Sequence, residues 1–242
     1  MEITAETLVA DIAAHHPRSI EVFGRHGIDF CCGGRRSLGE ACREHGALAE
    51  TVAAEITAAA AREVPADRVF TDAPLGALLD HIVSRYHGEL REDLPRLGRM
   101  ADKVAEVHGD RHPELHDLAR VYRELRSELE PHLVTEEERV FPSIRRLAGS
   151  GSAAGDVSGA LHSLEEEHER VGAALASLRS LSRGFVVPHD GCTTYQAFYE
   201  GLVRFEREMH EHVHLENNVL FPRVVSLDAR AASNRAAAVQ VR

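Results

Sequence analysis

The sequence predicts an all-α protein, in which a four-helix bundle follows a small helical N-terminal unit. Alanine-rich segments with few helix breakers run along most of the chain, and no run shows the β-branched alternation of a strand. Apolar residues recur at steps of three and four along four long segments, which is the spacing of an amphipathic helix. A His-x-x-x-Glu pattern followed by Phe-Pro occurs twice, beginning at His132 and at His212. The four-residue step puts both side chains of each pair on one helix face.

The N-terminal unit is expected to span residues 1–62 as short helices around a tight turn. Pro17 favours a helix start, because the N–H that proline lacks is not needed in the first turn. We expect helices at Arg18–Arg25, Leu38–Glu44 and Leu48–Arg62, a turn at Asp29–Gly34 and a linker at Glu63–Asp67.

The bundle is expected to span residues 70–226. Asp72 can cap its first helix and Pro74 suits the first turn of that helix, while a Gly- and Ser-rich loop at 149–155 separates the second helix from the third. We expect the long helices at 72–107, 113–147, 157–181 and 194–225, followed by a flexible tail at 227–242.

Composition restricts the class of protein. The 242 residues carry 28 Lys and Arg against 39 Asp and Glu, and the resulting net charge of −11 disfavours nonspecific binding to nucleic acid. The N-terminus does not resemble a signal peptide, and no apolar run approaches the length of a membrane span. We therefore expect a soluble, cytoplasmic protein without a membrane partner, whose four cysteines are thiols.

Six polar residues occupy positions on the apolar stripes where leucine would be expected. They are His87, His132, Glu136, His168, His212 and Glu216. A buried carboxylate without a partner costs several kcal/mol, roughly, and coordination of a metal offsets that cost. Four imidazoles and two carboxylates suit two transition-metal ions, so a dinuclear site is the leading hypothesis, with internal His–Glu pairing as the alternative.

The identity of the metal is left open by the ligand types, which fit Fe, Mn or Zn. A structural zinc site is less favoured, because none of the six residues is a cysteine. Two histidines and one oxygen from each glutamate would leave each ion room for an oxo bridge and an open position. Pro131, which directly precedes His132, is expected either to re-aim that ligand or to form a tolerated kink.

Two further carboxylates lie close in sequence to the predicted ligands. Glu128 is one helical turn before His132, and Glu167 directly precedes His168. Each could accept a hydrogen bond from a ligand or relay protons and water, and the ligand-face position favours Glu128. The alternative is that both are exposed surface carboxylates.

Adjacent cysteines mark the turn of the N-terminal unit. Arg35 and Arg36 follow Cys31 and Cys32, and positive charge lowers the pKa of a thiol. We interpret the two cysteines as an exposed pair for redox chemistry or metal transfer, and the alternative is two buried, inert thiols.

These residues together resemble the repair-of-iron-centres family, the ScdA/YtfE-type di-iron proteins. The segments that carry the resemblance are Phe30-Cys31-Cys32-Gly33-Gly34, Arg85-Tyr86-His87, Leu94-Pro95, His132-x-x-x-Glu136, Phe141-Pro142, Glu167-His168, Cys192-Thr193-Thr194 and His212-x-x-x-Glu216-Asn217-Asn218-Val219-Leu220-Phe221-Pro222. The resemblance implies an N-terminal ScdA-type domain followed by a hemerythrin-like four-helix bundle. It also implies that the six stripe residues bind iron, with Glu136 and Glu216 bridging, and that Glu128 and Glu167 lie near the metal.

The resemblance implies repair of iron–sulfur clusters damaged by nitric oxide or by oxidants, through donation of iron from two oxo-bridged Fe ions. Cys31 and Cys32 would then take part in iron delivery or in NO handling. The expected partners are damaged or apo iron–sulfur proteins, the gases NO and O2, and peroxide, and a homodimer is left open. The alternatives are a di-iron nitric oxide reductase or peroxidase, and a sensor that binds O2 or NO. The symmetric ligand set argues against simple carriage of O2.

Overall fold

The computed structural model describes residues 1–61, 70–150 and 156–240. Its regular elements over these residues are all helices, apart from one isolated β-bridge between Leu8 and Ser37, so the expected all-α class is confirmed. The short helices of the N-terminal part are α1 (Val9–His15), α2 (Ser19–His26), α3 (Leu38–Glu44) and α4 (Ala49–Ala60).

Longer helical stretches make up the rest of the described chain. The first is α5 (Leu75–His81), η2 (Ile82–His87) and α6 (Gly88–His108), and the second is α7 (Glu114–Thr135), η3 (Glu136–Val140) and α8 (Phe141–Ser150). The third is α9 (Val157–Leu181), and the fourth is α10 (Thr193–His214), η4 (Leu215–Leu220) and α11 (Phe221–Gln240).

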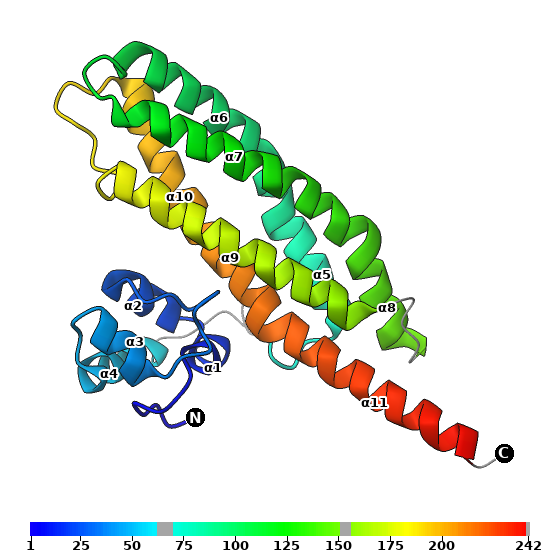
Figure 1. Ribbon diagram of the computed structural model, residues 1–242. Helices are drawn as coiled ribbons and strands as arrows, with labels where there is room; N and C mark the ends of the chain where they lie inside the picture. Colours follow the sequence, from blue (N-terminus) through cyan, green and yellow to red (C-terminus); the bar gives the residue numbers. More distant parts are fainter. Residues whose placement is uncertain (62–69, 151–155, 241–242) are drawn as a thin grey trace. The chain divides into compact units, whose positions relative to one another are not determined.

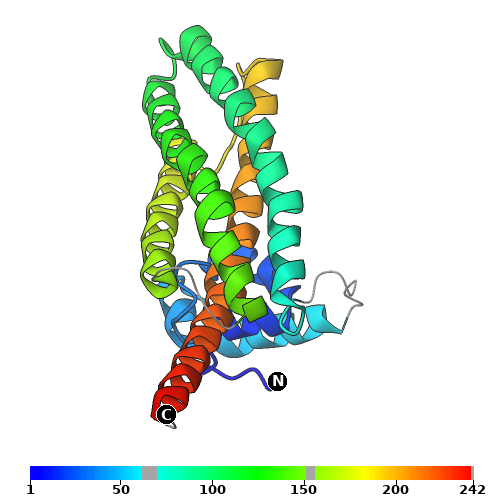
Figure 2. The ribbon, with the colours of Figure 1, turned by 90° about the vertical axis from the view of Figure 1, so that its right-hand side faces the viewer.

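The chain divides into two compact units. Unit 1 consists of Met1–Asp80, Ser143–Ser158 and His210–Arg242, and unit 2 consists of His81–Pro142 and Gly159–Met209. In unit 2, α6 and α7 run side by side with most of α9 and α10, and the two views agree on this arrangement (Figure 1, Figure 2).

Unit 2 buries the apolar stripes that the sequence analysis identified. Stripe positions of all four long helices are buried, and they include Leu90, Leu94, Leu97, Leu125, Leu129, Leu164, Leu175, Leu178, Phe198, Leu202, Phe205 and Met209. Burial of such side chains, at about 1.5–3 kcal/mol each, is the main force that holds a bundle of this kind together.

Unit 1 has a core of its own, in which α1 to α4 meet. The fully buried side chains of these helices include Val9, Ile12, Val22, Phe23, Leu38, Val52 and Ile56. Helix α3 begins with a capping box: Ser37 Oγ accepts from the backbone N–H of Glu40, and the Glu40 carboxylate accepts from the backbone N–H of Ser37. Helix α1 also packs against η4, so the unit includes a part of the fourth long stretch.

In the described part of the chain, three π-helical turns interrupt the long helices. Both η3 and η4 end directly before a Phe-Pro pair, at Phe141-Pro142 and Phe221-Pro222. Proline cannot donate to the carbonyl four residues back, and a wider turn just before it lets the helix continue without that bond. His87 closes η2, Glu136 opens η3 and Glu216 lies in η4, and π turns occur frequently at functional sites.

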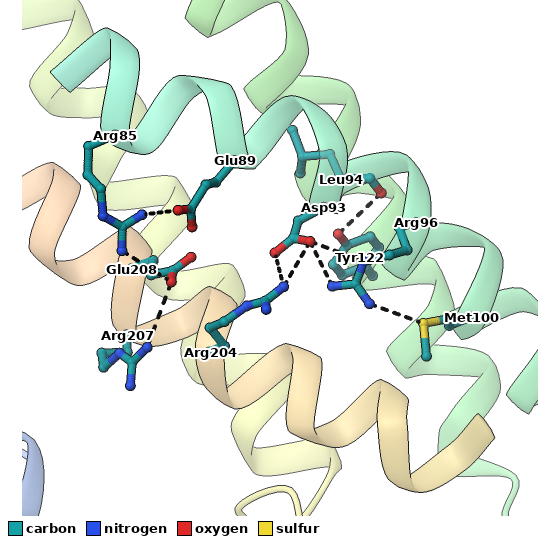
Figure 3. A network of polar contacts seen from close by, with 10 residues as sticks. All are labelled: Arg85, Glu89, Asp93, Leu94, Arg96, Met100, Tyr122, Arg204, Arg207 and Glu208. Atoms are coloured by element: carbon teal, nitrogen blue, oxygen red, sulfur yellow. Dashed lines mark hydrogen bonds and ion pairs between the residues drawn. The ribbon is translucent and has the colours of Figure 1, made fainter. Parts of the chain in front are cut away.

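Two buried carboxylates tie the first and last helices of unit 2 together. Asp93 of α6 accepts from Arg96 on its own helix and from Arg204 on α10, at 2.7 and 2.8 Å (Figure 3). Glu208 of α10 lies 3.5 Å from Arg85 of η2 in the same network. The arginines are partly exposed, so these pairs contribute to the alignment of the helices more than to stability.

The helix boundaries differ from the expected ones at three places. Helix α1 was not expected, because its seven residues are too few to show a clear period. Helix α8 continues to Ser150, into the start of the expected loop, and α11 continues to Gln240 although the pattern placed the end at 225. Alanine-rich sequence after residue 228 has a high helix propensity, which accounts for the longer last helix.

The expected linker at Glu63–Asp67 and the part of the expected loop at 151–155 lie outside the described residues. Among the helices that the structure describes, none has both the length and the apolar character that crossing a membrane requires.

Candidate metal centre

Four of the six predicted ligands come together inside unit 2. His87, His132, Glu136 and His168 come from η2, α7, η3 and α9, and each is at most 4% exposed. Oε2 of Glu136 lies 3.4 Å from Nε2 of His87 and 3.4 Å from Nε2 of His132. Nε2 of His168 lies 3.3 Å from Nε2 of His132. The four side chains therefore direct nitrogen and oxygen atoms at one small volume.

Glu136 is the central residue of this group. Its carboxylate is fully buried, and within the described part of the chain neither oxygen has a hydrogen-bond partner, although two ring nitrogens are nearby. An ionised carboxylate needs donors or a cation when it is buried. Its surroundings therefore suit a cation.

Nε2 of His87, the ring nitrogen nearest to Glu136, is an acceptor because Nδ1 of the same ring acts as the donor. Nδ1 of His87 donates to Oε1 of Glu137 at 2.7 Å, and Arg91 donates to the same oxygen at 2.6 Å. The Nδ1–H tautomer leaves a lone pair on Nε2, which is the form that binds a metal. Burial works against ionisation of Glu137, but the bonds from Arg91 and His87 outweigh it and lower the pKa of that carboxyl.

His132 has an equivalent arrangement with a different carboxylate. Its Nδ1 donates to Oε2 of Glu167 at 2.6 Å, so Nε2 again carries the lone pair that faces Glu136. The hydrogen bond from His132 outweighs the effect of burial and lowers the pKa of the Glu167 carboxyl. An ionised acceptor behind each imidazole orients the ring and raises its basicity as a ligand.

The second His-x-x-x-Glu pair is carried by α10 and η4. His212 is 1% exposed and Glu216 is fully buried, and Nε2 of His212 lies 3.1 Å from Oε1 of Glu216. The four-residue step therefore places both side chains of the repeat together, as the first pair does.

Within unit 2, His132, Glu136 and His168 each offer one ligand atom that lies within 4.8 Å of the others, and His87 lies beside the same glutamate. Within unit 1, His212 and Glu216 form the second pair. Three imidazoles around a buried carboxylate that has no hydrogen-bond partner among the described residues make the donors of unit 2 fit a metal cation.

Glu128 and Glu167, the two additional carboxylates from the sequence, differ in their surroundings. Glu167 contacts a predicted ligand directly. Glu128 is 53% exposed and pairs with Arg170 at 3.6 Å. Glu128 lies one turn before His132 in α7, and its side chain reaches solvent there. The predicted relay role of Glu128 stays a prediction, and the contacts favour Glu167.

The cysteine turn differs from the expectation in its electrostatics. Oδ1 of Asp29 accepts from the backbone N–H of Cys31 at 2.9 Å and of Cys32 at 3.1 Å, and it accepts from the Cys31 thiol at 3.2 Å. The hydrogen bond with Cys32, burial and the nearby Asp29 raise the pKa of the Cys31 thiol well above its usual value. The interpretation that arginines lower this pKa is therefore wrong for Cys31, because Arg36 instead pairs with Glu44 and the backbone.

Exposure of the two thiols also differs. Cys31 is 4% exposed, Cys32 is half-buried and both are free thiols, with their sulfurs 3.8 Å apart. The expectation of an exposed pair therefore holds in part for Cys32 and is wrong for Cys31, whose side chain packs into unit 1.

Sequence reasoning missed three residues that the structure places at these sites. Asp29 could have been found as the Asx residue that begins the cysteine turn, whereas the position of Glu137 beside the ligand stripe gives no signal of its contact with His87. Asn218 was noticed only as part of a motif. Its side-chain nitrogen lies 3.0 Å from the carbonyl oxygen of Phe30 and 3.2 Å from that of Cys31.

Comparison with family models assigns both parts of the chain. A model described as "Hemerythrin HHE cation binding domain" matches residues 78–234. A model named ScdA_N and described as "Domain of Unknown function (DUF542)" matches residues 5–60. All six candidate ligands lie inside the segment that matches the cation-binding domain.

Curated relatives align with 86–90% of this chain. The iron-sulfur cluster repair protein ScdA of Staphylococcus haemolyticus is 39% identical over 220 residues, which is 90% of this chain and 98% of that protein. The iron-sulfur cluster repair protein YtfE of Citrobacter koseri is 35% identical over 218 residues, 90% of this chain and 96% of that protein. A protein of the same name from Yersinia pseudotuberculosis is 37% identical over 209 residues, 86% of this chain and 92% of that protein.

Proposed function

We propose, on the premise that this chain belongs to the family of ScdA- and YtfE-type iron–sulfur cluster repair proteins, that it repairs clusters damaged by nitrosative or oxidative stress. The observation that carries the proposal is that the similarity covers both domains, with 90% of this chain and 98% of the staphylococcal ScdA aligned. A match to the bundle alone would support a metal-binding fold and no particular task, because one fold serves many functions.

The metal in this proposal is iron, and the centre would hold two ions. The six residues predicted from the apolar stripes, His87, His132, Glu136, His168, His212 and Glu216, would hold them. Imidazole and carboxylate donors suit iron among other transition metals. Bound iron would supply the redox chemistry of the centre and the metal that a depleted cluster lacks.

Two carboxylates near this centre hold the protons of two ligand imidazoles in place. Glu137 and Glu167 hold the Nδ1 protons of His87 and His132, which supports metal binding through Nε2. Both carboxylates are partly exposed, at 25% and 33%, so each connects a buried imidazole with solvent. On this proposal they also move protons between the centre and water.

The proposed partners are iron–sulfur proteins that have lost iron, together with NO, O2 or peroxide as the damaging agents. We place the reaction in the cytoplasm, where the free thiols of Cys31 and Cys32 stay reduced. The thiols are proposed to receive iron on its way to the damaged protein, since thiolate is the ligand type that clusters themselves use.

Transfer of labelled iron tests this function. The reduced chain would be loaded with isotopically labelled iron and mixed with a purified iron–sulfur protein that NO has inactivated. We expect label to enter the damaged protein and its cluster absorbance to return. Glu136→Ala should abolish both, whereas Glu138→Ala, an exposed neighbour, should behave as the unaltered chain does.

Other outcomes of the same experiment would favour the alternatives. Repeated turnover of NO with a reductant, without transfer of label, would indicate a nitric oxide reductase. Reversible binding of O2 without transfer would indicate a sensor. Absence of label from the damaged protein at full loading of the chain would contradict iron donation.

A further inference from the structure

The cysteine turn of unit 1 is a rigid structure held from several sides. The backbone N–H of Ala10 donates to the carbonyl of Gly34 at 2.8 Å, which ties the turn to α1. A Cβ atom at Gly34 would lie 2.8 Å from the carbonyl oxygen of Phe30 and 2.9 Å from the Cβ of Ala10, so only glycine fits there. Asn218 donates to the carbonyls of Phe30 and Cys31 from η4. The backbone of the turn is thus held from α1 and from η4.

Three potential metal ligands meet in this turn. One ligand atom each from Asp29, Cys31 and Cys32 lies within 4.8 Å of the others. The two sulfurs are 3.8 Å apart, and the edge of a tetrahedron with metal–sulfur bonds of about 2.3 Å is also about 3.8 Å. The Cys31 sulfur lies 3.2 Å from Oδ1 of Asp29, where about 3.6 Å is needed for a metal with bonds of ~2.3 and ~2.1 Å. A shift of a few tenths of an ångström brings the Cys31 sulfur and the Asp29 oxygen to that distance.

We propose that Asp29, Cys31 and Cys32 form a second metal site, separate from the His/Glu centre, that takes one thiophilic divalent cation such as Fe2+ or Zn2+. Binding replaces the thiol protons of Cys31 and Cys32, so two protons leave to solvent, two metal–sulfur bonds form and no electron is transferred. Three protein ligands leave the fourth tetrahedral position for water or for a ligand of an acceptor protein. Asp29 and Cys32 are half-buried, so an acceptor can reach the site.

Asp29 is suited to this role because its hydrogen bonds orient it without using all of its lone pairs. Oδ1 accepts from the N–H groups of Cys31 and Cys32, and Oδ2 accepts from the N–H of Gly33 at 2.9 Å. A carboxylate offers about four acceptor positions, one of which now takes the Cys31 thiol proton. When that proton leaves, the acceptor position becomes available to the metal.

Metal binding by this turn does not depend on the function proposed above, whereas its use as the place where iron is handed over does. The two can therefore be separated by experiment, with cobalt as a probe of thiolate ligation. The His/Glu centre offers no thiolate, so charge-transfer absorption from sulfur to Co2+ would come from cysteines alone.

Titration of the reduced, full-length chain with Co2+ under anaerobic conditions tests the site. We expect one equivalent of Co2+ to give a thiolate band, and X-ray absorption of the bound cobalt to count two sulfurs and one or more oxygens. Cys31→Ser and Cys32→Ser should each lose at least half of the band. Cys42→Ser and Cys192→Ser, which remove the other two thiols, should keep it.

Asp29→Asn distinguishes a ligand from a cap, because the amide keeps one acceptor oxygen for the turn but loses the charge. We expect Co2+ to bind at least tenfold more weakly to Asp29→Asn, and Asp11→Asn on exposed α1 surface to leave the affinity unchanged. Equal Co2+ affinity of Asp29→Asn and the unaltered chain would mean that Asp29 caps the turn and does not bind the metal. Where a variant fails to fold, the number of sulfurs around cobalt in the unaltered chain still tests ligation by Cys31 and Cys32.

A variant of the other centre separates the two proposals. Glu136→Ala should keep the thiolate band at full intensity. Failure of cluster repair with the band intact would overturn the proposed function and leave the site standing. Absence of any thiolate band from the unaltered chain, or a sulfur count of zero, would overturn the site itself.

Discussion

Nδ1 of His87 donates to Glu137 across 2.7 Å, and this contact decides which nitrogen of the ring faces Glu136. Arg91 binds the same carboxylate, so Glu137 stays ionised and keeps the imidazole in the Nδ1–H tautomer. The contact between His87 of η2 and Glu137 of η3 therefore leaves the lone pair of His87 Nε2 available to a metal inside the bundle.

Replacing Glu137 by glutamine should weaken metal binding without removing a ligand. The amide has nearly the same size but lacks the charge, so it holds the His87 ring less firmly and lowers its basicity. We expect the affinity for Fe2+ to fall about 10- to 100-fold. Competition with a chelator, followed by metal analysis, measures the change.

Glu138→Gln is the matched control, because Glu138 is the next residue and is exposed. An equal loss of affinity in both variants would mean that the overall negative charge matters and that the contact with His87 does not.

Burial of the six polar stripe residues was predictable from sequence, because they replace leucine at positions of regular period. Glu137 was not, since successive residues of a helix point about 100° apart and a position beside a stripe gives no information about another helix. His87 reaches Glu137 only through the rotation of η2 relative to η3, which periodicity does not fix. Burial of Cys31 was likewise unpredictable, because it depends on packing inside unit 1 and Arg36 turned out to bind elsewhere.

Glu167 and Glu128 should differ in their effect on the metal centre although both lie near His132 in sequence or in space. Glu167→Gln removes the charged acceptor of the His132 Nδ1 proton, and we expect a loss of about tenfold or more in Fe2+ affinity. Glu128→Gln removes only a pair with exposed Arg170, and the affinity should stay within about twofold. The same chelator competition measures both variants, and a larger effect of Glu128→Gln would restore the relay role that the sequence suggested.

Glu208 should make the stability of the chain depend on pH in the direction opposite to most carboxylates. Burial and repulsion by Glu89 raise the pKa of Glu208, against the attraction of Arg85 and Arg204. A folded-state pKa above the unfolded value gives stability that is complete below the unfolded pKa and is lost as pH rises through the folded pKa. Relative to the unaltered chain, Glu208→Gln should therefore gain stability as pH rises from about 4 to about 7.

Urea unfolding at both pH values, in the presence of a chelator that removes bound metal, measures this difference. Glu55→Gln is a control of opposite sign, because hydrogen bonds from Arg25 and His26 lower the pKa of Glu55. Stability that depends on this lowered pKa is present above the unfolded value, so Glu55→Gln should lose stability relative to the unaltered chain as pH rises. A Glu208→Gln variant that follows the Glu55 control would contradict the assignment.

Asn218 should be the residue that keeps the cysteine turn ordered. Its amide nitrogen donates to the carbonyls of Phe30 and Cys31 and lies 3.1 Å from Nδ1 of His214. Burial lowers the pKa of His214 to about 4, so the ring is neutral near pH 7 and its Nδ1 can accept from the amide. Asn218→Ala removes a donor that these acceptors share, at a cost of about 1–3 kcal/mol. Hydrogen exchange of the backbone amides at 29–36 should become faster in that variant, and the urea midpoint should fall.

Gln196→Ala is the matched control, because Gln196 donates only to exposed Glu200 on α10. It should leave both exchange in the turn and the urea midpoint nearly unchanged. Asn218→Asp keeps the size of the side chain but turns a donor into an acceptor facing two carbonyl oxygens, so it should speed exchange at 29–36 more than Asn218→Ala does. Unchanged exchange in both Asn218 variants would show that the bond from Ala10 to Gly34 and the bonds to Asp29 order the turn without Asn218.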